Sequence, residues 1–254
     1  MGKEGLLFML RVLSVDWDYF IDADAVKRGS LFPDIPNEKL AYSLQNMIWA
    51  SRYSDVGGDA MSRIGLLPVL DTFLKDVPRK IPYVFVVNSH RYAYDFIIDL
   101  MRKQKRRELC LTNLDFHHDT WSNRTGVDCG NWLRKLMDKY NGRYTWVGHA
   151  DSGQTERDKR LFFTPNYKDA LVKDIKWDVL FVCRSDMWSP PHLDKAFIRS
   201  FKPLSEIGKG LAETRIWEDR YEVIKDTIQQ LREAREAAML REVHKDELKD
   251  RKRS

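Results

Sequence analysis

Cysteine is scarce in this chain, and its spacing argues against a disulfide framework. The three cysteines, Cys110, Cys129 and Cys183, are odd in number and widely separated, and none belongs to a Cys-x-x-Cys pair. This pattern is typical of reduced thiols in a cytosolic protein. Cys110 and Cys183 lie in apolar, strand-like runs and are expected in the core.

Long apolar runs are absent as well. No stretch of about eighteen uninterrupted apolar residues occurs, so no membrane span is expected. The opening Met1-Gly-Lys-Glu does not begin the basic stretch, apolar core and small-residue cleavage site of a secretory signal. Together these absences predict a cytoplasmic protein that has no membrane partner.

Net charge is modest. The sequence has 43 Lys+Arg and 38 Asp+Glu, which gives a formal charge of +5. This mildly basic balance permits an acidic partner but does not require nucleic acid, and we expect none.

The apolar pattern alternates between strands and helices. We expect strands over residues 6–17, 83–90, 109–115, 144–147 and 177–183, and helices over 37–53, 67–77, 92–106 and 131–140. Asn37 is a candidate cap of the first helix, and Asn141-Gly142 a stop for the last. This alternation predicts an α/β three-layer sandwich with a mostly parallel sheet.

The chain is long enough for one large domain, which we place at residues 1–214. Residues 215–254 have a short apolar stripe of Ile224, Ile228 and Leu231, and charge dominates after it. We expect a surface helix that frays into a solvated tail, packed on or extending from the domain. A basic or coiled contact with a partner is the alternative. The polar segment 151–160 is a candidate active-site loop.

Acidic and imidazole side chains follow three of the expected strands. Asp16 and Asp18 follow the first strand, and His90 follows the second. Asp115, His117 and Asp119 follow the third. Residues two apart in a strand point the same way, and buried charges are costly unless they are paired or bound to metal. Ligands of parallel sheets bind beyond the carboxyl ends of the strands, so these six residues are candidate metal ligands.

Each candidate also has a purely structural interpretation. His90 could be a hydrogen-bonded residue, and Asp16 and Asp18 could cap a neighbouring helix. Asp186 could contact substrate or pair with Arg184. Asn131 has the same ambiguity between substrate binding and helix capping. Three further groups of residues remain open: His118 is expected to point away from His117, His149 is a core histidine or a proton shuttle, and Trp49, Trp121 and Trp188 could line a cleft.

An oxygen-rich set with two imidazoles suits a hard divalent ion such as Mn²⁺ or Mg²⁺. The pattern resembles the arginase/agmatinase (ureohydrolase) superfamily. Asn88-Ser-His90 is similar to its histidine strand end, Asp115-Phe-His-His-Asp119 to its D-x-H-x-D motif, and Ser14-Val-Asp-Trp-Asp18 to its S-x-D-x-D motif. The last motif comes late in ordinary arginases but first here. This order, with Asp128-Cys-Gly-Asn-Trp132, resembles the permuted arginase-like family that contains the peptide arginases.

The resemblance implies an arginase-like fold with permuted strand order and a site for two Mn²⁺ ions. Asp16 and Asp115 would bridge them, His90 and Asp119 would complete one position, and His117 and Asp18 the other. Asp18, or an unassigned group, would pass a proton to the leaving amine, and Asn131 and Asp186 would be substrate contacts. Arginases hold the guanidinium with a glutamate, for which Glu38, Glu156 and Glu213 are candidates.

The implied activity is hydrolysis of arginine residues in a ribosomally made precursor peptide. A metal-bridging hydroxide would release urea and leave ornithine, a peptide modification of natural product biosynthesis. Two alternatives remain: hydrolysis of free arginine, agmatine or another small guanidino or amide compound, and a non-catalytic, metal-stabilised module that binds an acidic partner through residues 102–107 and the tail. The sequence leaves the oligomeric state open.

Overall fold

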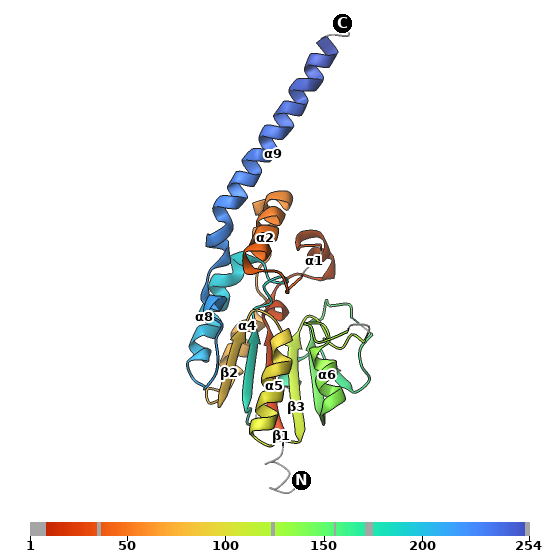
Figure 1. The fold of residues 1–254 in the computed structure, drawn as a ribbon, viewed down its shortest axis with the longest axis vertical. Coiled ribbons are helices and arrows are strands. Elements are labelled where there is room, and N and C mark those ends of the chain that lie inside the picture. Colours follow the sequence, from red (N-terminus) through yellow and green to blue (C-terminus); the bar gives the residue numbers. More distant parts are fainter. Residues whose placement is uncertain (1–8, 35–36, 123–124, 155, 171–174, 252–254) are drawn as a thin grey trace.

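A six-stranded parallel sheet forms the centre of the computed structural model, which describes residues 9–34, 37–122, 125–154, 156–170 and 175–251 (Figure 1). The strand order is β2-β6-β1-β3-β4-β5. The strands are β1 (Met9–Asp16), β2 (Tyr83–Val87), β3 (Glu108–Asp115), β4 (Asn141–Gly148), β5 (Leu161–Thr164) and β6 (Val179–Cys183). Every pairing is parallel, which confirms the predicted α/β class.

Helices cover both faces of the sheet. They are α1 (Ala25–Leu31), α2 (Tyr42–Val56), α3 (Gly58–Ser62), α4 (Val69–Asp76), α5 (Arg91–Lys103), α6 (Trp132–Lys139), α7 (Tyr167–Ala170), α8 (Asp194–Ser205) and α9 (Arg220–Arg251). Three short 3₁₀ turns accompany them: η1 (Trp17–Phe20), η2 (Pro191–Leu193) and η3 (Thr214–Trp217).

The alternation of side chains along β1 explains the three layers. Leu10 and Val12 pack with residues of α5 and α6 in one apolar cluster. Leu13 and Val15 pack with residues of α4 and α8 in a second cluster on the opposite face. All five residues of β6 are buried, as expected for a strand covered on both faces.

Several element boundaries differ from those predicted. The expected helix over 37–53 begins at Tyr42, so Asn37 is not its cap and instead accepts a hydrogen bond from the backbone of Lys39. Asn141 and Gly142 open β4 rather than ending a helix. Strand β1 is described from Met9, and residues 6–8 of the expected strand lie outside the described residues. The edge strand β5 was not predicted.

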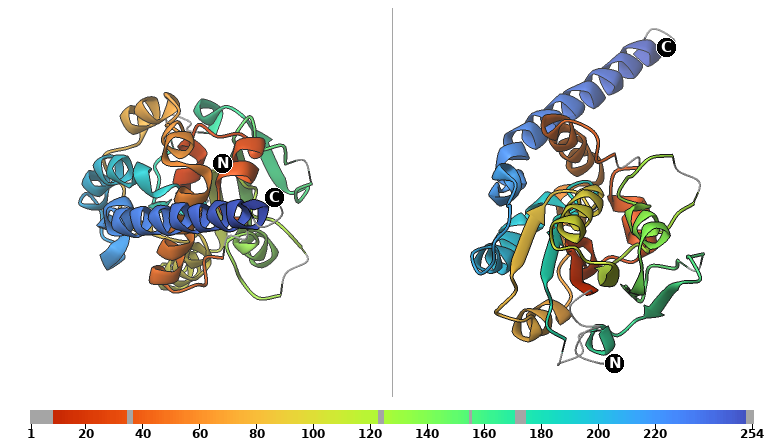
Figure 2. Two further views of the ribbon diagram at one scale, coloured as in Figure 1. Left: turned by 90° about the horizontal axis from the view of Figure 1, so that it is seen from above. Right: turned by 60° about the horizontal axis from the view of Figure 1, so that its bottom comes forward.

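The C-terminal part of the long helix α9 projects away from the body of the protein (Figures 1 and 2). Ile224 and Ile228 are buried near its start, whereas Met239 and Leu240 are 69% and 71% exposed. The helix continues to Arg251, so the expected fraying after the apolar stripe is wrong for the described residues. No helix in the described ranges is both long and apolar enough to cross a membrane.

Candidate metal centre

All six predicted ligands lie at the carboxyl edge of the sheet, but strand alternation is not what unites them. Asp16 and Asp115 are the last residues of the neighbouring strands β1 and β3. Asp18 lies in the 3₁₀ turn η1. His117 and Asp119 follow the end of β3, and Asp119 has a left-handed backbone with φ of 53°. Tight turns after the strands therefore bring these side chains together, which corrects the expected geometry.

His90 is the centre of one group of carboxylates. Its Nδ1 lies 2.9 Å from Asp16 Oδ2, 3.2 Å from Asp115 Oδ2 and 3.5 Å from Asp119 Oδ2. Its other ring nitrogen, Nε2, is 3.0 Å from the hydroxyl of Ser14. Metal-binding histidines characteristically present one nitrogen to the ion while the other is held by a neighbouring polar group.

His117 forms a second group that shares Asp115 with the first. Its Nδ1 lies 3.3 Å from Asp18 Oδ2 and 3.8 Å from Asp115 Oδ1. The two oxygens of Asp115 thus face different imidazoles, and the amide of Asn113 donates to Asp115 Oδ2 at 3.1 Å. A carboxylate between two such groups is the arrangement expected of a ligand that bridges paired ions.

The concentration of negative charge shifts the ionisation of the site. Burial, with the charges of Asp18 and Asp115, raises the pKa of Asp16 to about 7. Burial and the charge of Asp115 raise the pKa of Asp119 well above its usual value. Burial also disfavours ionised Asp18, but a hydrogen bond from His117 and the charge of Arg28 outweigh it and lower its pKa to about 2. Cations would relieve the repulsion that raises the first two values.

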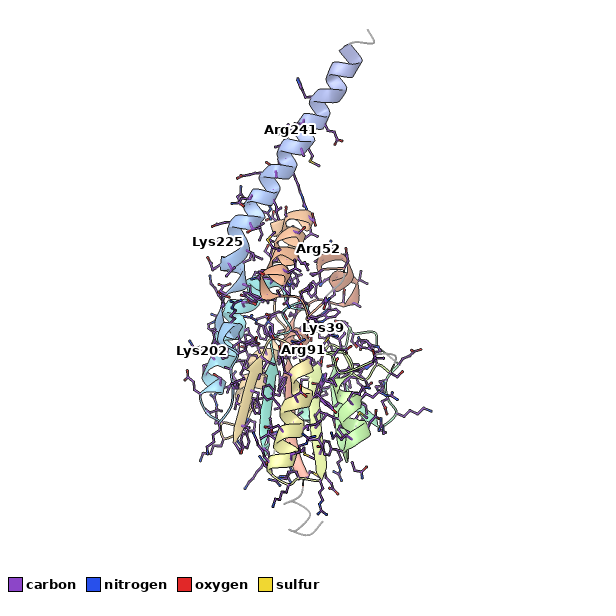
Figure 3. The ribbon with its side chains drawn as sticks, viewed as in Figure 1. Lys39, Arg52, Arg91, Lys202, Lys225 and Arg241 are labelled. Atoms are coloured by element: carbon purple, nitrogen blue, oxygen red, sulfur yellow. The ribbon has the colours of Figure 1, made fainter. Side chains whose placement is uncertain are left out.

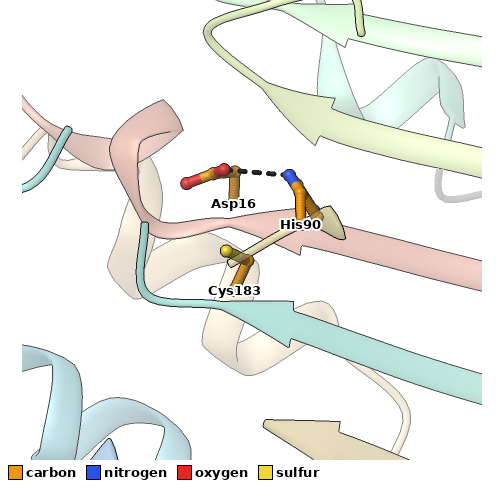
Figure 4. Close-up of side chains that lie close together, drawn as sticks. All are labelled: Asp16, His90 and Cys183. Carbon is orange, nitrogen blue, oxygen red and sulfur yellow. Dashed lines mark ion pairs between the residues drawn. The ribbon is translucent and has the colours of Figure 1, made fainter. Parts of the chain in front are cut away.

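The residue types fit hard divalent ions. Asp16, Asp18 and Asp115 are at most 3% exposed, and the oxygens and imidazoles face one another at ligand-sharing distances. Cys183 on β6 also lies near Asp16 and His90 (Figure 4). Burial and the nearby charges of Asp16 and Glu38 raise the pKa of its thiol well above the ordinary value, and its Sγ lies 3.3 Å from the hydroxyl of Ser185.

Glu38 enters the same pocket from the loop before α2. The pocket is lined by both histidines and by Glu38, Trp121 and Trp188, and three of the four candidate aspartate ligands also line it: Asp16, Asp115 and Asp119. The hydroxyl of Ser89 donates to Glu38 Oε2. Within the described part of the chain Glu38 Oε1 is buried and has no hydrogen-bond partner, and burial raises the pKa of this carboxyl to about 7. A buried acceptor without a partner is costly, so the pocket is suited to a ligand that donates hydrogen bonds.

The predicted substrate contacts lie apart from this pocket. Asn131 is fully buried and binds its own loop: its Nδ2 donates to Gly126 O at 3.0 Å, and its Oδ1 accepts from Asp128 N at 2.9 Å. Asp186 forms a bidentate ion pair with Arg184 at 2.5 and 3.0 Å. Neither side chain lines the metal pocket in the described residues. Asp186 forms the predicted pair with Arg184, whereas Asn131 precedes α6 without a side-chain hydrogen bond to that helix, so the capping role is not seen.

The remaining histidine and tryptophan candidates differ in whether they line the pocket. His118 points away from the ligands, as expected, and its Nδ1 accepts from Thr120 N at 3.0 Å. Trp121 and Trp188 line the pocket, and the Trp188 ring lies 4.6 Å from that of His117. Trp49 instead lies in the core and donates to the carbonyl of Asp186. His149 is buried, packed on the rings of Phe116 and Tyr19.

The polar segment 151–160 lies beside the loop that carries His117. Gln154 Oε1 accepts from His118 N at 3.0 Å, and Asp158 N donates to Thr120 Oγ1 at 3.2 Å. These bonds hold the segment against the ligand-bearing loop.

Trp132 holds one of the candidate ligands in place. Its indole N–H donates to Asp119 Oδ2 at 2.6 Å from the start of α6. Replacing Trp132 with phenylalanine keeps a buried ring and removes this donor. We expect the affinity for a divalent metal ion to fall by about 10–100-fold, as is typical when a ligand loses its orienting hydrogen bond. Metal titration checks this, with the outlying Trp217→Phe as control. Equal affinities in the two variants would contradict the assignment.

Comparison of the chain with models of known protein families, with curated proteins and with solved structures gives no match.

Proposed function

We propose that this protein is a hydrolase with two Mn²⁺ ions that converts arginine residues of a ribosomally made peptide into ornithine and urea. The observation that carries the proposal is the pair of imidazole–carboxylate groups that share Asp115. The resemblance of the three ligand motifs to those of ureohydrolases supports the reaction type. That resemblance alone supports a peptide as the substrate.

Hydrolysis of a guanidinium group requires a strong nucleophile and side chains that bind the cation. Resonance makes the guanidinium carbon a poor electrophile, and two divalent ions would supply an activated water and offset the charge that develops on attack. The chain itself supplies the binding groups. Glu38 Oε1, buried and without a partner among the described residues, can accept guanidinium N–H groups. Trp121 and Trp188 would exclude water beside it. Transfer of a proton by Asp18 stays a prediction.

The decisive experiment incubates the purified protein and Mn²⁺ with a peptide that contains arginine, beside free arginine and agmatine. Mass spectrometry should show that the peptide loses the mass of cyanamide, and a chelator should block the change. Conversion of free arginine or agmatine alone would assign a small guanidino substrate. If no substrate changes across a panel of arginine peptides while Mn²⁺ is bound, the proposed reaction is wrong.

Glu38 provides a separate test of guanidinium binding. Replacing Glu38 with glutamine removes its charge and keeps its size. We expect kcat/KM to fall by about 10–100-fold, mainly through KM, because a hydrogen bond to a charged partner is worth roughly 1.5–3 kcal/mol. Steady-state urea release measures this, with the exposed Glu156→Gln as control. An unchanged KM would exclude Glu38 as the guanidinium contact.

The non-catalytic alternative gains no support from the position of the basic residues. Residues 102–107 precede β3 and lie at its amino end, the sheet edge opposite the metal centre. Figure 3 places Lys202 on α8, and Lys225 and Arg241 far apart along α9. These cations do not form a surface that is continuous with the site.

A further inference from the structure

A second cavity has a volume of about 320 Å³. Some of its lining residues are immediate neighbours in sequence of residues that line the metal pocket. Asn88, which lines it, precedes Ser89 and His90, and Asp186, which also lines it, follows Ser185. None of its lining residues lines the metal pocket. It is therefore a separate space that shares two loops with the metal centre.

Three of its lining residues carry polar atoms that lack a partner. Tyr42 Oη, Asn88 Oδ1 and Glu213 Oε2 are buried, and no described residue makes a well-formed hydrogen bond to any of them. Burial raises the pKa of Tyr42 to about 12, and the side chains of Glu218 and Asn46 lie close enough to its hydroxyl to affect that value. A buried polar atom without a partner costs roughly 1–3 kcal/mol. Two of these atoms can only accept hydrogen bonds and the third can do so. The cavity therefore calls for a ligand rich in N–H or O–H donors.

The cations around the cavity do not satisfy this demand. Arg184 donates two hydrogen bonds to Asp186. It also donates to the backbone carbonyls of Ile216 and Glu218, and each of these two bonds is 2.9 Å long. Arg215 is exposed at the cavity, with its guanidinium carbon 5.2 Å from the centre of the Tyr42 ring. Among the described residues, Glu213 is thus the carboxylate with an unpartnered oxygen that a ligand in this cavity would meet. Burial raises the pKa of this carboxyl, against the opposing effects of a backbone hydrogen bond from Asn88 and the nearby charges of Arg184 and Arg91.

We propose that this cavity binds an ammonium or guanidinium group. Glu213 supplies the opposite charge, and Asn88 and Tyr42 accept further N–H bonds. The group belongs either to a free basic amino acid or to a basic side chain of a bound peptide. The proposal does not depend on the hydrolase activity, because none of these three residues lines the metal pocket.

Calorimetric titration of the chelator-treated full-length protein tests this inference. The probes are L-arginine, L-lysine and a peptide with blocked ends and one lysine. We expect at least one probe to bind, and Glu213→Gln to weaken it by roughly tenfold or more, as for loss of a charge-assisted hydrogen bond. Tyr42→Phe, which retains the ring beneath Arg215, should weaken it by a smaller factor. The exposed Glu206→Gln should have no effect.

The pattern among the variants separates the outcomes. Binding of a free amino acid assigns a small-molecule site, and binding of the peptide alone assigns a subsite for a substrate side chain. Binding that Glu38→Gln abolishes and Glu213→Gln and Tyr42→Phe leave intact would belong to the metal pocket and would overturn the proposal. No binding of any probe at millimolar concentration would also overturn it and leave a water-filled cavity. Thermal unfolding of each variant establishes that it is folded.

Discussion

Replacing Asp115 with asparagine is expected to abolish hydrolysis and release the bound metal. Asp115 is 1% exposed and, in the part of the chain that the structure describes, is the one carboxylate that faces both imidazoles. We expect kcat/KM to fall by about 10³-fold or more, because metal stabilisation of a reaction is worth several kcal/mol and each ~1.4 kcal/mol is a factor of ten. The measurements are urea release and metal content per protein chain.

The exposed Asp95→Asn on α5 is the control, and it should keep wild-type activity and metal content. An Asp115 variant with full activity would eliminate the proposed hydrolase. Loss of activity with two ions still bound would leave the enzyme assignment intact and remove Asp115 as a shared ligand.

Replacing Arg220 with methionine is expected to lower the free energy of unfolding more than any other substitution proposed for this protein. Arg220 is 1% exposed at the start of α9, and it donates to both oxygens of Asp194 at 2.7 Å and to the carbonyl of Ser189 at 2.9 Å. Its loss would leave Asp194, itself fully buried, without its main counter-charge. Removal of one partner from a buried ion pair costs about 3–5 kcal/mol.

For a domain of this size, such a loss lowers the melting temperature by roughly 6–20 °C. Thermal and urea unfolding measure it, with the exposed Arg241→Met on the distal part of α9 as control. A variant as stable as the control would mean that the other charges nearby, Arg184 above all, suffice to balance Asp194.

The sheet and the cluster of candidate ligands were within reach of sequence analysis because both depend on short, local patterns. Continuous apolar runs such as β6 indicate a sheet buried on both faces, and acidic residues directly after such runs indicate the active edge. The predicted alternation of Asp115, His117 and Asp119 nevertheless assumed that the strand continues. A left-handed residue at Asp119 breaks that pattern, and nothing in the sequence marks it.

The role of Glu38 was beyond sequence analysis because it depends on long-range packing. Nothing in the sequence favours Glu38 over the other two candidates for the guanidinium contact, Glu156 and Glu213. Only the fold brings Glu38 to Ser89, 51 residues away. The pairing of Asp186 with Arg184, two residues away, was one of the two alternatives that the sequence offered, whereas its contact with Arg220 depends on the position of the start of α9. Strand β5 was missed because it is a short edge strand that includes Phe162, which is 66% exposed.

The central position of β1 has a consequence for synthesis on the ribosome. β1 is the first strand to emerge, yet its neighbours β3 and β6 come much later, and Arg11 bonds to Asp178 across 167 residues. At 5–20 residues per second this interval lasts roughly 8–33 s. During that time β1 can pair with β3 but lacks its neighbour β6, which also links it to β2 and so to the segment that carries His90. We therefore expect nascent chains that end before residue 183 to bind a divalent metal ion more weakly at this centre than the full chain does.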